Sequence, residues 1–202
     1  MYPHAVRHLK RADPVLAKLI TRVGPCRFAP ITAGSHFHFI VRAIVFQQLS
    51  TKAAATIHRR FLELLGGPEP APHAVAAVPD AKLRAAGLSR QKLSYIKDLG
   101  RKVDAGEVRL DHVEALDDQA AIAELTKVKG IGVWSAQMFL IFRLGRPDVL
   151  PVGDLGIQKG VQLLYGLRAL PSPKRVLKIG RPWSPYATIA SWYLWRSLDA
   201  RP

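Results

Sequence analysis

Two glycines separated by one residue lie between lysines and a tryptophan in LTKVKGIGVWSAQMF, residues 125–139. Gly130 and Gly132 can adopt a positive φ, or allow a close approach, that other residues resist. A chain that reverses here between two helices leaves several N–H groups beside the positive N-terminus of the second helix, which suits a phosphate oxygen. Lys127 and Lys129 add positive charge at the same place. The segment therefore predicts a helix-hairpin-helix that binds a nucleic-acid backbone without reading its sequence.

The charge of the chain favours this interpretation over the alternative, an ordinary helical hairpin that ends in a glycine. Thirty Lys and Arg against fifteen Asp and Glu give the 202-residue chain a formal charge of +15. A polyanion is the partner that suits such an excess, although a merely solvated basic surface gives the same number. The hairpin and the charge together indicate DNA binding.

The elements that must position the hairpin are helices, because start and stop signals recur along the chain at helix spacing. Gly24 and the Gly66-Gly67 pair end two apolar-periodic segments. The segments GGPEPAPHA, GRPDVLPVGDLG and ALPSPKR are expected to be loops. No run of alternating β-branched residues is long enough for a sheet, so we predict an all-α fold of about ten short helices in one compact unit. The expected N-cap residues are Asp13, Ser35, Ser50, Asp80, Ser89, Asp117 and Ser184, the last followed by proline.

Several kinds of site are disfavoured by the residues that the chain contains. The single cysteine, Cys26, can form neither an internal disulfide nor a four-cysteine metal site. His36 and His38 point to different faces of a helix and have no third ligand at a suitable spacing, so we expect no metal. No apolar run approaches membrane-spanning length and no signal segment is present, so we expect no membrane association and a cytoplasmic, nucleoid-associated location. Phosphate-loop, zinc-deaminase and α/β-hydrolase motifs do not occur.

Four separate segments resemble the helix-hairpin-helix DNA glycosylases, and within them the 3-methyladenine DNA glycosylase II branch. They are FIVRAIVFQQLSTKAA, LRAAGLSRQKLSYIKDL, the hairpin segment and GRPDVLPVGDLGIQKGV, in this order. The resemblance runs from about residue 12 to the final helix. It implies two helical lobes with the active site in the cleft between them, and we expect lobe one at about 36–146 and lobe two at about 1–35 plus 147–202. The longer members begin with an additional β-rich domain, for which this chain has no room.

The resemblance implies a catalytic aspartate shortly after the hairpin, and the motif matches this chain at Asp154 in VGDLG. Cleavage of an N-glycosidic bond develops oxocarbenium character on the sugar, which a nearby carboxylate stabilises while it orients or deprotonates the attacking water. By sequence alone Asp154 is better explained as the N-cap of a helix, and both roles can hold together. Asp148 is the other carboxylate nearby, but RPD before VLP indicates a loop.

A glycosylase of this family extrudes the target nucleotide, so the resemblance also implies a residue that fills the gap and walls that hold the base. It assigns the inserted residue to Gln48, with Gln47 directly before it. Gln48 departs from the apolar wedge of some members, and a polar residue at a helix end is the alternative. The walls are assigned to Trp134, Trp192 and Tyr193, whose electron-rich rings would attract a cationic alkylated purine, with core packing as the alternative.

Further DNA contacts are expected around the hairpin. Ser135 would join Lys127, Lys129 and the two glycines in binding phosphate, and Lys92 in SRQKLSYI would either contact phosphate or be solvated. No cofactor is expected. Whether the hairpin carbonyl groups hold a monovalent cation, as they do in some members of the fold, is left open by the sequence.

The implied function is a monofunctional, monomeric DNA glycosylase that hydrolyses the bond between deoxyribose and an alkylated purine, such as 3-methyladenine or 7-methylguanine, in double-stranded DNA. In bifunctional relatives such as endonuclease III, a lysine in the place of Trp134 attacks the sugar through its amine. An indole cannot do so, so we expect no lyase activity at the abasic site. Two alternatives stay open: a non-catalytic helix-hairpin-helix DNA-binding module, and a glycosylase of the same fold for an etheno-modified, oxidised or mispaired base.

Overall fold

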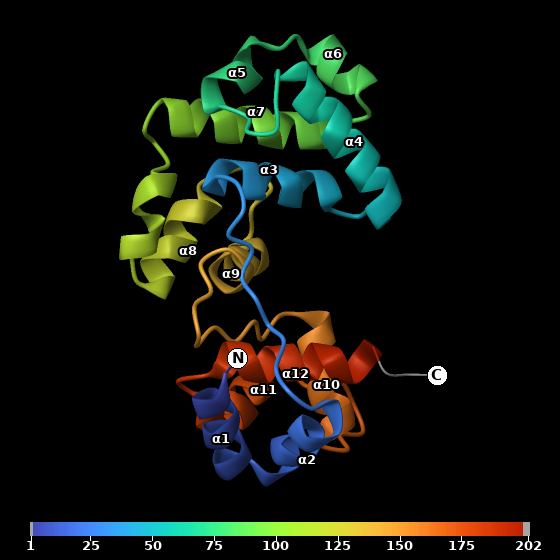
Figure 1. The fold of residues 1–202 in the computed structure, drawn as a ribbon, viewed down its shortest axis with the longest axis vertical. Helices are drawn as coiled ribbons and strands as arrows, with labels where there is room; N and C mark the ends of the chain where they lie inside the picture. Colours follow the sequence, from blue (N-terminus) through green and yellow to red (C-terminus); the bar gives the residue numbers. More distant parts are fainter. Residues whose placement is uncertain (1, 200–202) are drawn as a thin grey trace. The chain divides into compact units, whose positions relative to one another are not determined.

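The computed structural model describes residues 2–199, which form helices joined by short connections (Figure 1). No strand occurs in this part of the chain, which confirms the all-α prediction. No helix within it is long and apolar enough to cross a bilayer. In chain order the elements are α1 (Pro3–Ala12), α2 (Pro14–Val23), α3 (His36–Phe46), α4 (Thr51–Leu64), α5 (Pro72–Ala77), α6 (Asp80–Ala85), α7 (Arg90–Asp104), η1 (Leu110–Ala115), α8 (Asp118–Thr126), α9 (Val133–Phe142), α10 (Leu155–Leu164), α11 (Pro173–Gly180), η2 (Arg181–Trp183) and α12 (Ala187–Asp199).

Most of the predicted helix starts are confirmed by a side-chain cap. Ser35, Ser50, Ser89 and Asp117 each accept a hydrogen bond from the backbone N–H three residues on. The Asp13 carboxylate accepts the backbone N–H groups of Val15 and Leu16 at the start of α2. Each cap satisfies an N–H group that the first turn leaves without a partner, which contributes about 1 kcal/mol to stability.

Two predicted caps are wrong, and two predicted loops are partly helical. Asp80 is the first residue of α6, and its carboxylate pairs with Lys97 Nζ at 3.0 Å instead of capping the helix. The Ser184 hydroxyl donates to Asp148, whose other carboxylate oxygen accepts the Ala187 N–H at 3.0 Å. The cap of α12 therefore comes from a distant loop, which local sequence cannot reveal. α5 and α11 begin inside GGPEPAPHA and ALPSPKR.

The chain folds into two compact units. One is formed by Thr32–Phe139, and we call it the hairpin unit; the other combines the residues up to Ile31 with those from Leu140 onward, and we call it the terminal unit. The boundary lies within α9, whereas the sequence placed the limits of lobe one at 36 and 146. The last turn of α9 belongs with the N-terminal segment because the Ile31 N–H donates to the Phe142 carbonyl at 2.7 Å.

The hairpin unit is organised around α7, which packs against α3, α5 and α6. Its helices bury apolar side chains that recur at helix spacing, as expected for amphipathic helices around one core. The fully buried side chains include Ile44, Phe61, Leu83, Ile96 and Leu99.

The terminal unit is organised around α12, which packs against α2 and α10, while α1 packs against α2 and η2. The buried Asp13 carboxylate joins distant segments, because it also accepts hydrogen bonds from the Trp183 indole N–H at 2.9 Å and from the Tyr165 hydroxyl. A buried charge needs such donors, so this cluster fixes α2 against the C-terminal part of the chain.

Candidate functional site

The hairpin unit contains the predicted hairpin between α8 and α9. Gly130 has a φ of +79°, and a Cβ atom built there would lie 2.1 Å from Cδ2 of Tyr95 on α7. Gly132 has no such φ, and a Cβ atom built on it would meet no atom within 4 Å. Gly130 is therefore required by backbone conformation and by packing on α7, whereas Gly132 keeps the outer surface open.

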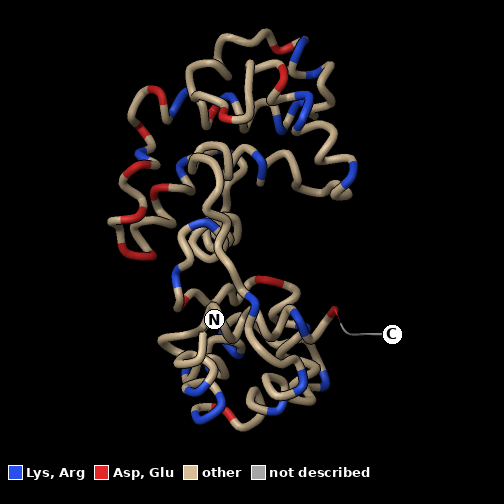
Figure 2. The backbone as a smooth tube through the Cα atoms, in the orientation of Figure 1, with Lys and Arg blue, Asp and Glu red and all other residues tan. Residues whose placement is uncertain are grey.

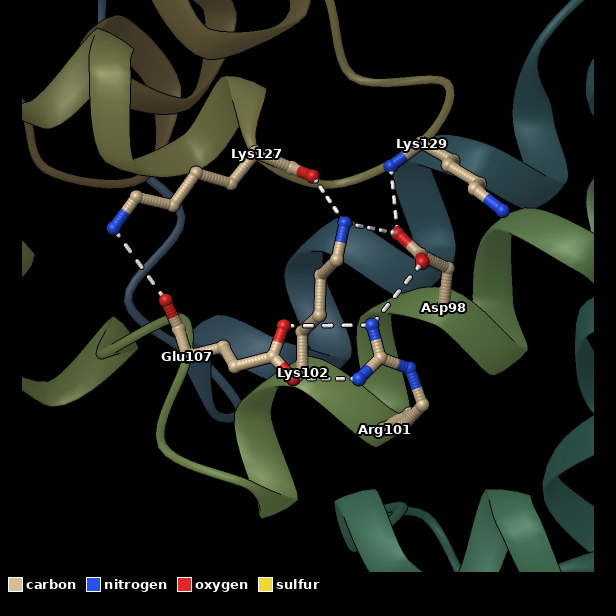
Figure 3. Close-up of polar contacts among 6 residues, drawn as sticks. All are labelled: Asp98, Arg101, Lys102, Glu107, Lys127 and Lys129. Atoms are coloured by element: carbon tan, nitrogen blue, oxygen red, sulfur yellow. Dashed lines mark hydrogen bonds and ion pairs between the residues drawn. The ribbon is translucent and has the colours of Figure 1, made fainter.

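Side chains of α7 hold the chain that leads into Gly130 (Figure 3). The buried Asp98 carboxylate accepts the Lys129 backbone N–H at 2.9 Å and pairs with Lys102 Nζ at 3.0 Å. The Lys102 ammonium also donates to the carbonyl oxygen of Lys127. Although burial opposes ionisation, the hydrogen bonds from Lys129 and Lys102 lower the pKa of Asp98. An ionised carboxylate thus holds the hairpin backbone through charge-assisted hydrogen bonds.

The residues predicted to bind phosphate differ in their surroundings. Lys127 Nζ pairs with Glu124 Oε2 at 2.6 Å, so part of its charge is compensated. Lys129 is exposed, and its ammonium makes no hydrogen bond or ion pair among residues 2–199. Ser135 is half-buried in the first turn of α9. Lys129 and the open surface at Gly132 are therefore the groups best placed for a phosphate.

Lys92 makes contacts within the protein. Its Nζ donates to the carbonyl oxygens of Val45 at 2.8 Å and Gln47 at 2.6 Å, which lie at the C-terminal end of α3. Burial lowers the pKa of Lys92. Free solvation of Lys92 is therefore excluded, because the ammonium satisfies carbonyl groups that the helix end leaves without partners. The phosphate contact stays a prediction.

The turn after α3 carries the residues predicted to enter DNA. Gln48 has a φ of 56°, the one positive φ outside glycine in the described chain, which costs about 1 kcal/mol or more and indicates a constrained turn. The Gln47 side chain donates from Nε2 to the Gly130 carbonyl at 3.3 Å, so Gln47 connects the turn to the hairpin instead of projecting from it. Gln48 and Leu49 are exposed, Leu49 by 40%. Leu49 was not among the predicted residues, although an apolar residue directly before the Ser50 cap was a signal for it.

Asp154, in the terminal unit, caps α10 as predicted. Its Oδ1 accepts the backbone N–H of Ile157 at 2.8 Å and the indole N–H of Trp195 at 2.9 Å. Gly156 makes room for the indole, because a Cβ atom there would lie 3.0 Å from Trp195 Cδ1. One carboxylate oxygen is therefore fixed both by its own helix and by α12.

Trp195 also lines an aromatic cavity of about 530 Å³ in the terminal unit. Its ring stacks on Phe142 with a centroid distance of 5.6 Å and an interplanar angle of 28°. Trp192, one helical turn earlier, lines the same cavity, as do Phe28, Arg27 and Arg196. Trp195 was not among the residues assigned to the base pocket, although its spacing of three residues from Trp192 places both indoles on one side of α12.

The other two residues predicted to form walls of the base pocket, Tyr193 and Trp134, are not among the residues that line this cavity. Tyr193 has no exposed surface, and its hydroxyl donates to the Gly24 carbonyl at 2.9 Å. Burial raises the pKa of Tyr193 to about 12. Tyr193 is thus a core residue and not an open wall, because neighbouring positions on a helix face different directions. Trp134 belongs to the hairpin unit, where 49% of it is exposed on α9.

The histidines have protein partners. His36 Nε2 lies 3.0 Å from Glu114 Oε1, and His38 lies between Glu69 and His58 at 3.2 Å from each. Burial lowers the pKa of His58 to about 4. Within residues 2–199 no three His, Cys, Asp or Glu side chains are grouped so that they could hold a metal ion.

Three carbonyl groups of the hairpin, the candidate site of a monovalent cation, accept hydrogen bonds. The donors are Lys102 Nζ for Lys127, the Ile131 N–H for Val128 and Gln47 Nε2 for Gly130. The Lys102 ammonium places a positive charge beside one of these oxygens, which opposes a second cation there.

Comparisons with known proteins agree on one family. The model described as "HhH-GPD superfamily base excision DNA repair protein" matches residues 41–185. DNA-3-methyladenine glycosylase 1 of Schizosaccharomyces pombe is 33% identical over 193 residues, which cover 94% of this chain and 85% of that relative. The structure of a DNA-3-methyladenine glycosidase from Bacillus halodurans has a TM-score of 0.87 at 38% identity, covering 97% of this chain and 89% of the other. A Schizosaccharomyces pombe 3-methyladenine DNA glycosylase in complex with abasic DNA has a TM-score of 0.83 at 32% identity, covering 97% of each chain.

Proposed function

Because the chain belongs to the HhH-GPD superfamily of base excision DNA repair proteins, we propose that it is a monofunctional DNA glycosylase that releases alkylated purines, such as 3-methyladenine and 7-methylguanine, from double-stranded DNA. One observation carries the proposal: the Asp154 carboxylate is fixed by Trp195, and the same indole lines an aromatic cavity. A DNA-binding module without catalysis would need neither feature.

Asp154 would act on the sugar. As the glycosidic bond breaks, positive charge develops on the deoxyribose, and a fixed carboxylate stabilises it without reorganising. The same group can orient or deprotonate the attacking water. An alkylated purine already carries a positive charge, so it leaves without protonation by a strong general acid. The two hydrogen bonds to Oδ1 would serve to keep the carboxylate in one orientation.

The base would be held by aromatic faces, and the opposite strand would be contacted by the turn after α3. Stacking of a cationic purine on Trp192 or Trp195 adds cation–π attraction of about 1–2 kcal/mol when water is excluded. Leu49 supplies the apolar side chain that Gln48 lacks, and both are exposed beside the hairpin. We propose that Leu49 and Gln48 fill the gap that the extruded nucleotide leaves.

A second substrate class is favoured by Arg27, which lines the aromatic cavity, whereas the charge of Arg196 in the same cavity is compensated by Asp199 at 2.8 Å. The charge of Arg27 opposes a cationic base inside the cavity and leaves a neutral base unaffected. A glycosylase of the same fold for an etheno-modified or mispaired base is therefore the second candidate. A set of duplexes, each with one defined lesion, tests both: release of 3-methyladenine above all other bases supports the first, and release of a neutral base alone supports the second.

Treatment with borohydride during the reaction should trap no covalent adduct between the protein and DNA. Trp134 occupies the place where a bifunctional relative has its lysine, and an indole forms no Schiff base with the sugar. Denaturing gel electrophoresis measures the adduct, with endonuclease III as the positive control. An adduct that disappears when one lysine of this chain is replaced would overturn the monofunctional assignment.

Trp195→Phe should lower kcat for base release by about 10–100-fold, because a hydrogen bond to a charged group contributes about 1.5–3 kcal/mol. The substitution keeps an aromatic ring beside Phe142 but removes the donor to Asp154. Single-turnover kinetics measure the effect. Phe142→Leu is the matched control, since it removes the stack and keeps the indole N–H; an equal loss of kcat in both variants would show that packing, and not the hydrogen bond, is what matters.

A further inference from the structure

Most of the excess positive charge of the chain belongs to the terminal unit and not to the hairpin unit (Figure 2). The terminal unit has sixteen Lys and Arg against four Asp and Glu, a formal excess of +12, whereas the hairpin unit has fourteen against eleven, an excess of +3. The hairpin therefore does not account for the charge that the composition shows.

Carboxylates compensate many of the cations in the hairpin unit. Lys102 pairs with Asp98, Arg101 with Glu107 at 2.6 Å, and Lys127 with Glu124. The four carboxylates of the terminal unit do not pair with the basic residues of α1 or α11. Their described partners are Trp183 for Asp13, Ser184 for Asp148, Trp195 for Asp154 and Arg196 for Asp199.

Two helices of the terminal unit, α1 and α11, carry a group of uncompensated cations. α1 and α11 both pack against η2, and His8 of α1 lies 3.2 Å from the carbonyl oxygen of Pro182 in η2. The residues that the two helices bury are small or apolar, namely Ala5 and Leu9 on α1 and Val176 and Gly180 on α11, whereas their basic residues are exposed. The basic residues are Arg7, Lys10 and Arg11 on α1, Lys174, Arg175 and Lys178 on α11, and Arg181 directly after it.

We call these seven residues the α1–α11 face. All seven are exposed, and none of their charged groups makes a hydrogen bond or an ion pair within residues 2–199. Like charges separated by less than about 10 Å repel one another at ordinary salt, so the face destabilises the compact state. A polyanion with regularly spaced charges removes that repulsion and releases its own counterions.

We propose that the α1–α11 face is a second DNA-binding surface, which holds the phosphate backbone of undamaged duplex independently of the hairpin. Four of its seven cations are arginines, whose planar groups bind phosphate through paired hydrogen bonds. The face contains no carboxylate that would repel a phosphate. The inference rests on the proposed function only in taking DNA as the substrate.

The test neutralises four residues of the face together: Arg7→Gln, Lys10→Gln, Lys174→Gln and Lys178→Gln. Fluorescence anisotropy measures the affinity for an undamaged duplex over a range of KCl concentrations. Each lost phosphate contact reduces the slope of log K against log [KCl] by about 0.9, so the slope should fall by about 3–4. The matched control replaces Arg59, Arg60, Lys82 and Arg84, all exposed in the hairpin unit, by Gln, which removes the same net charge. Its slope should change by less than about 1.

Equal slopes for the wild type and the face variant would overturn the proposal. So would equal reductions in both variants, because net charge alone would then explain the effect. Binding to vesicles containing phosphatidylserine that depends on the face, with an unchanged DNA slope, would assign the face to membranes instead.

Two further measurements separate failure of the proposed surface from a loss of folding and from failure of the glycosylase assignment. Removing repulsion should leave the thermal midpoint of the face variant no lower than that of the wild type. If it is lower, the two half-variants, Arg7→Gln/Lys10→Gln and Lys174→Gln/Lys178→Gln, should each reduce the slope by about 2, and unchanged slopes in both contradict the proposal. A wild type that releases no alkylated base but shows the expected slopes refutes the glycosylase assignment and leaves the second surface in place.

Discussion

Asp154→Asn should lower the rate of alkylpurine release by about 10²–10³-fold, because it removes the charge that stabilises the transition state. The amide oxygen of Asn can still accept the N–H groups of Ile157 and Trp195, which both bind the same carboxylate oxygen, Oδ1. The helix cap and the fold should therefore persist. Single-turnover release from methylated DNA measures the rate, and the thermal midpoint should stay within a few degrees of the wild type.

Asp148→Asn is the control for this variant. Asp148 accepts the Ser184 hydroxyl and the Ala187 N–H at the start of α12, so its role is structural. Its replacement should lower stability by about 1 kcal/mol and leave the rate of the folded enzyme within about threefold. If instead Asp148→Asn abolishes release while Asp154→Asn retains the wild-type rate, the catalytic assignment is wrong.

Gly130→Ala should reduce affinity for damaged and undamaged duplex alike by more than about tenfold. A side chain at φ +79° costs about 1 kcal/mol, and its Cβ atom would lie 2.1 Å from the Tyr95 ring, so the hairpin must move. The movement would disturb the hairpin amides proposed to bind phosphate and the carbonyl that Gln47 binds. Anisotropy with both duplexes measures the loss.

Gly132→Ala is the comparison for the hairpin. Its φ lies outside the left-handed region, and the added Cβ atom meets no protein atom within 4 Å, so stability should not fall. Any loss of affinity in Gly132→Ala then reports close approach of a phosphate to the hairpin. Unchanged DNA affinity in Gly130→Ala would contradict the role of the hairpin.

The features that the sequence predicts well depend on neighbouring residues. Four Ser or Asp caps and the glycine hairpin follow from interactions within a few positions, and the structure has them. Membership of the HhH-GPD superfamily confirms the resemblance drawn from four segments. The helix periodicity could have shown that Trp192 and Trp195 lie on one side of the final helix and the buried Tyr193 on another, since residues three apart share a side and adjacent ones do not.

The features that the sequence does not predict depend on contacts between distant residues. In the sequence, Lys92 looks like an exposed lysine. Its partner Gln47, at the end of α3, lies 45 residues earlier in the chain, and only the packing of α7 against α3 brings the two together. The cap of α12 comes from Asp148, 39 residues before Ala187. The net charge does not show where in the fold the excess of basic residues lies, and the structure places most of that excess in the terminal unit.

Chromatographic detection of free base released from alkylated double-stranded DNA tests the central claim most directly. The wild type should release 3-methyladenine and leave an abasic strand that stays intact until it is treated with alkali, while Asp154→Asn releases the base at a rate lower by about 10²–10³-fold. Absence of release by the wild type, or equal rates for the two proteins, would contradict hydrolysis assisted by Asp154.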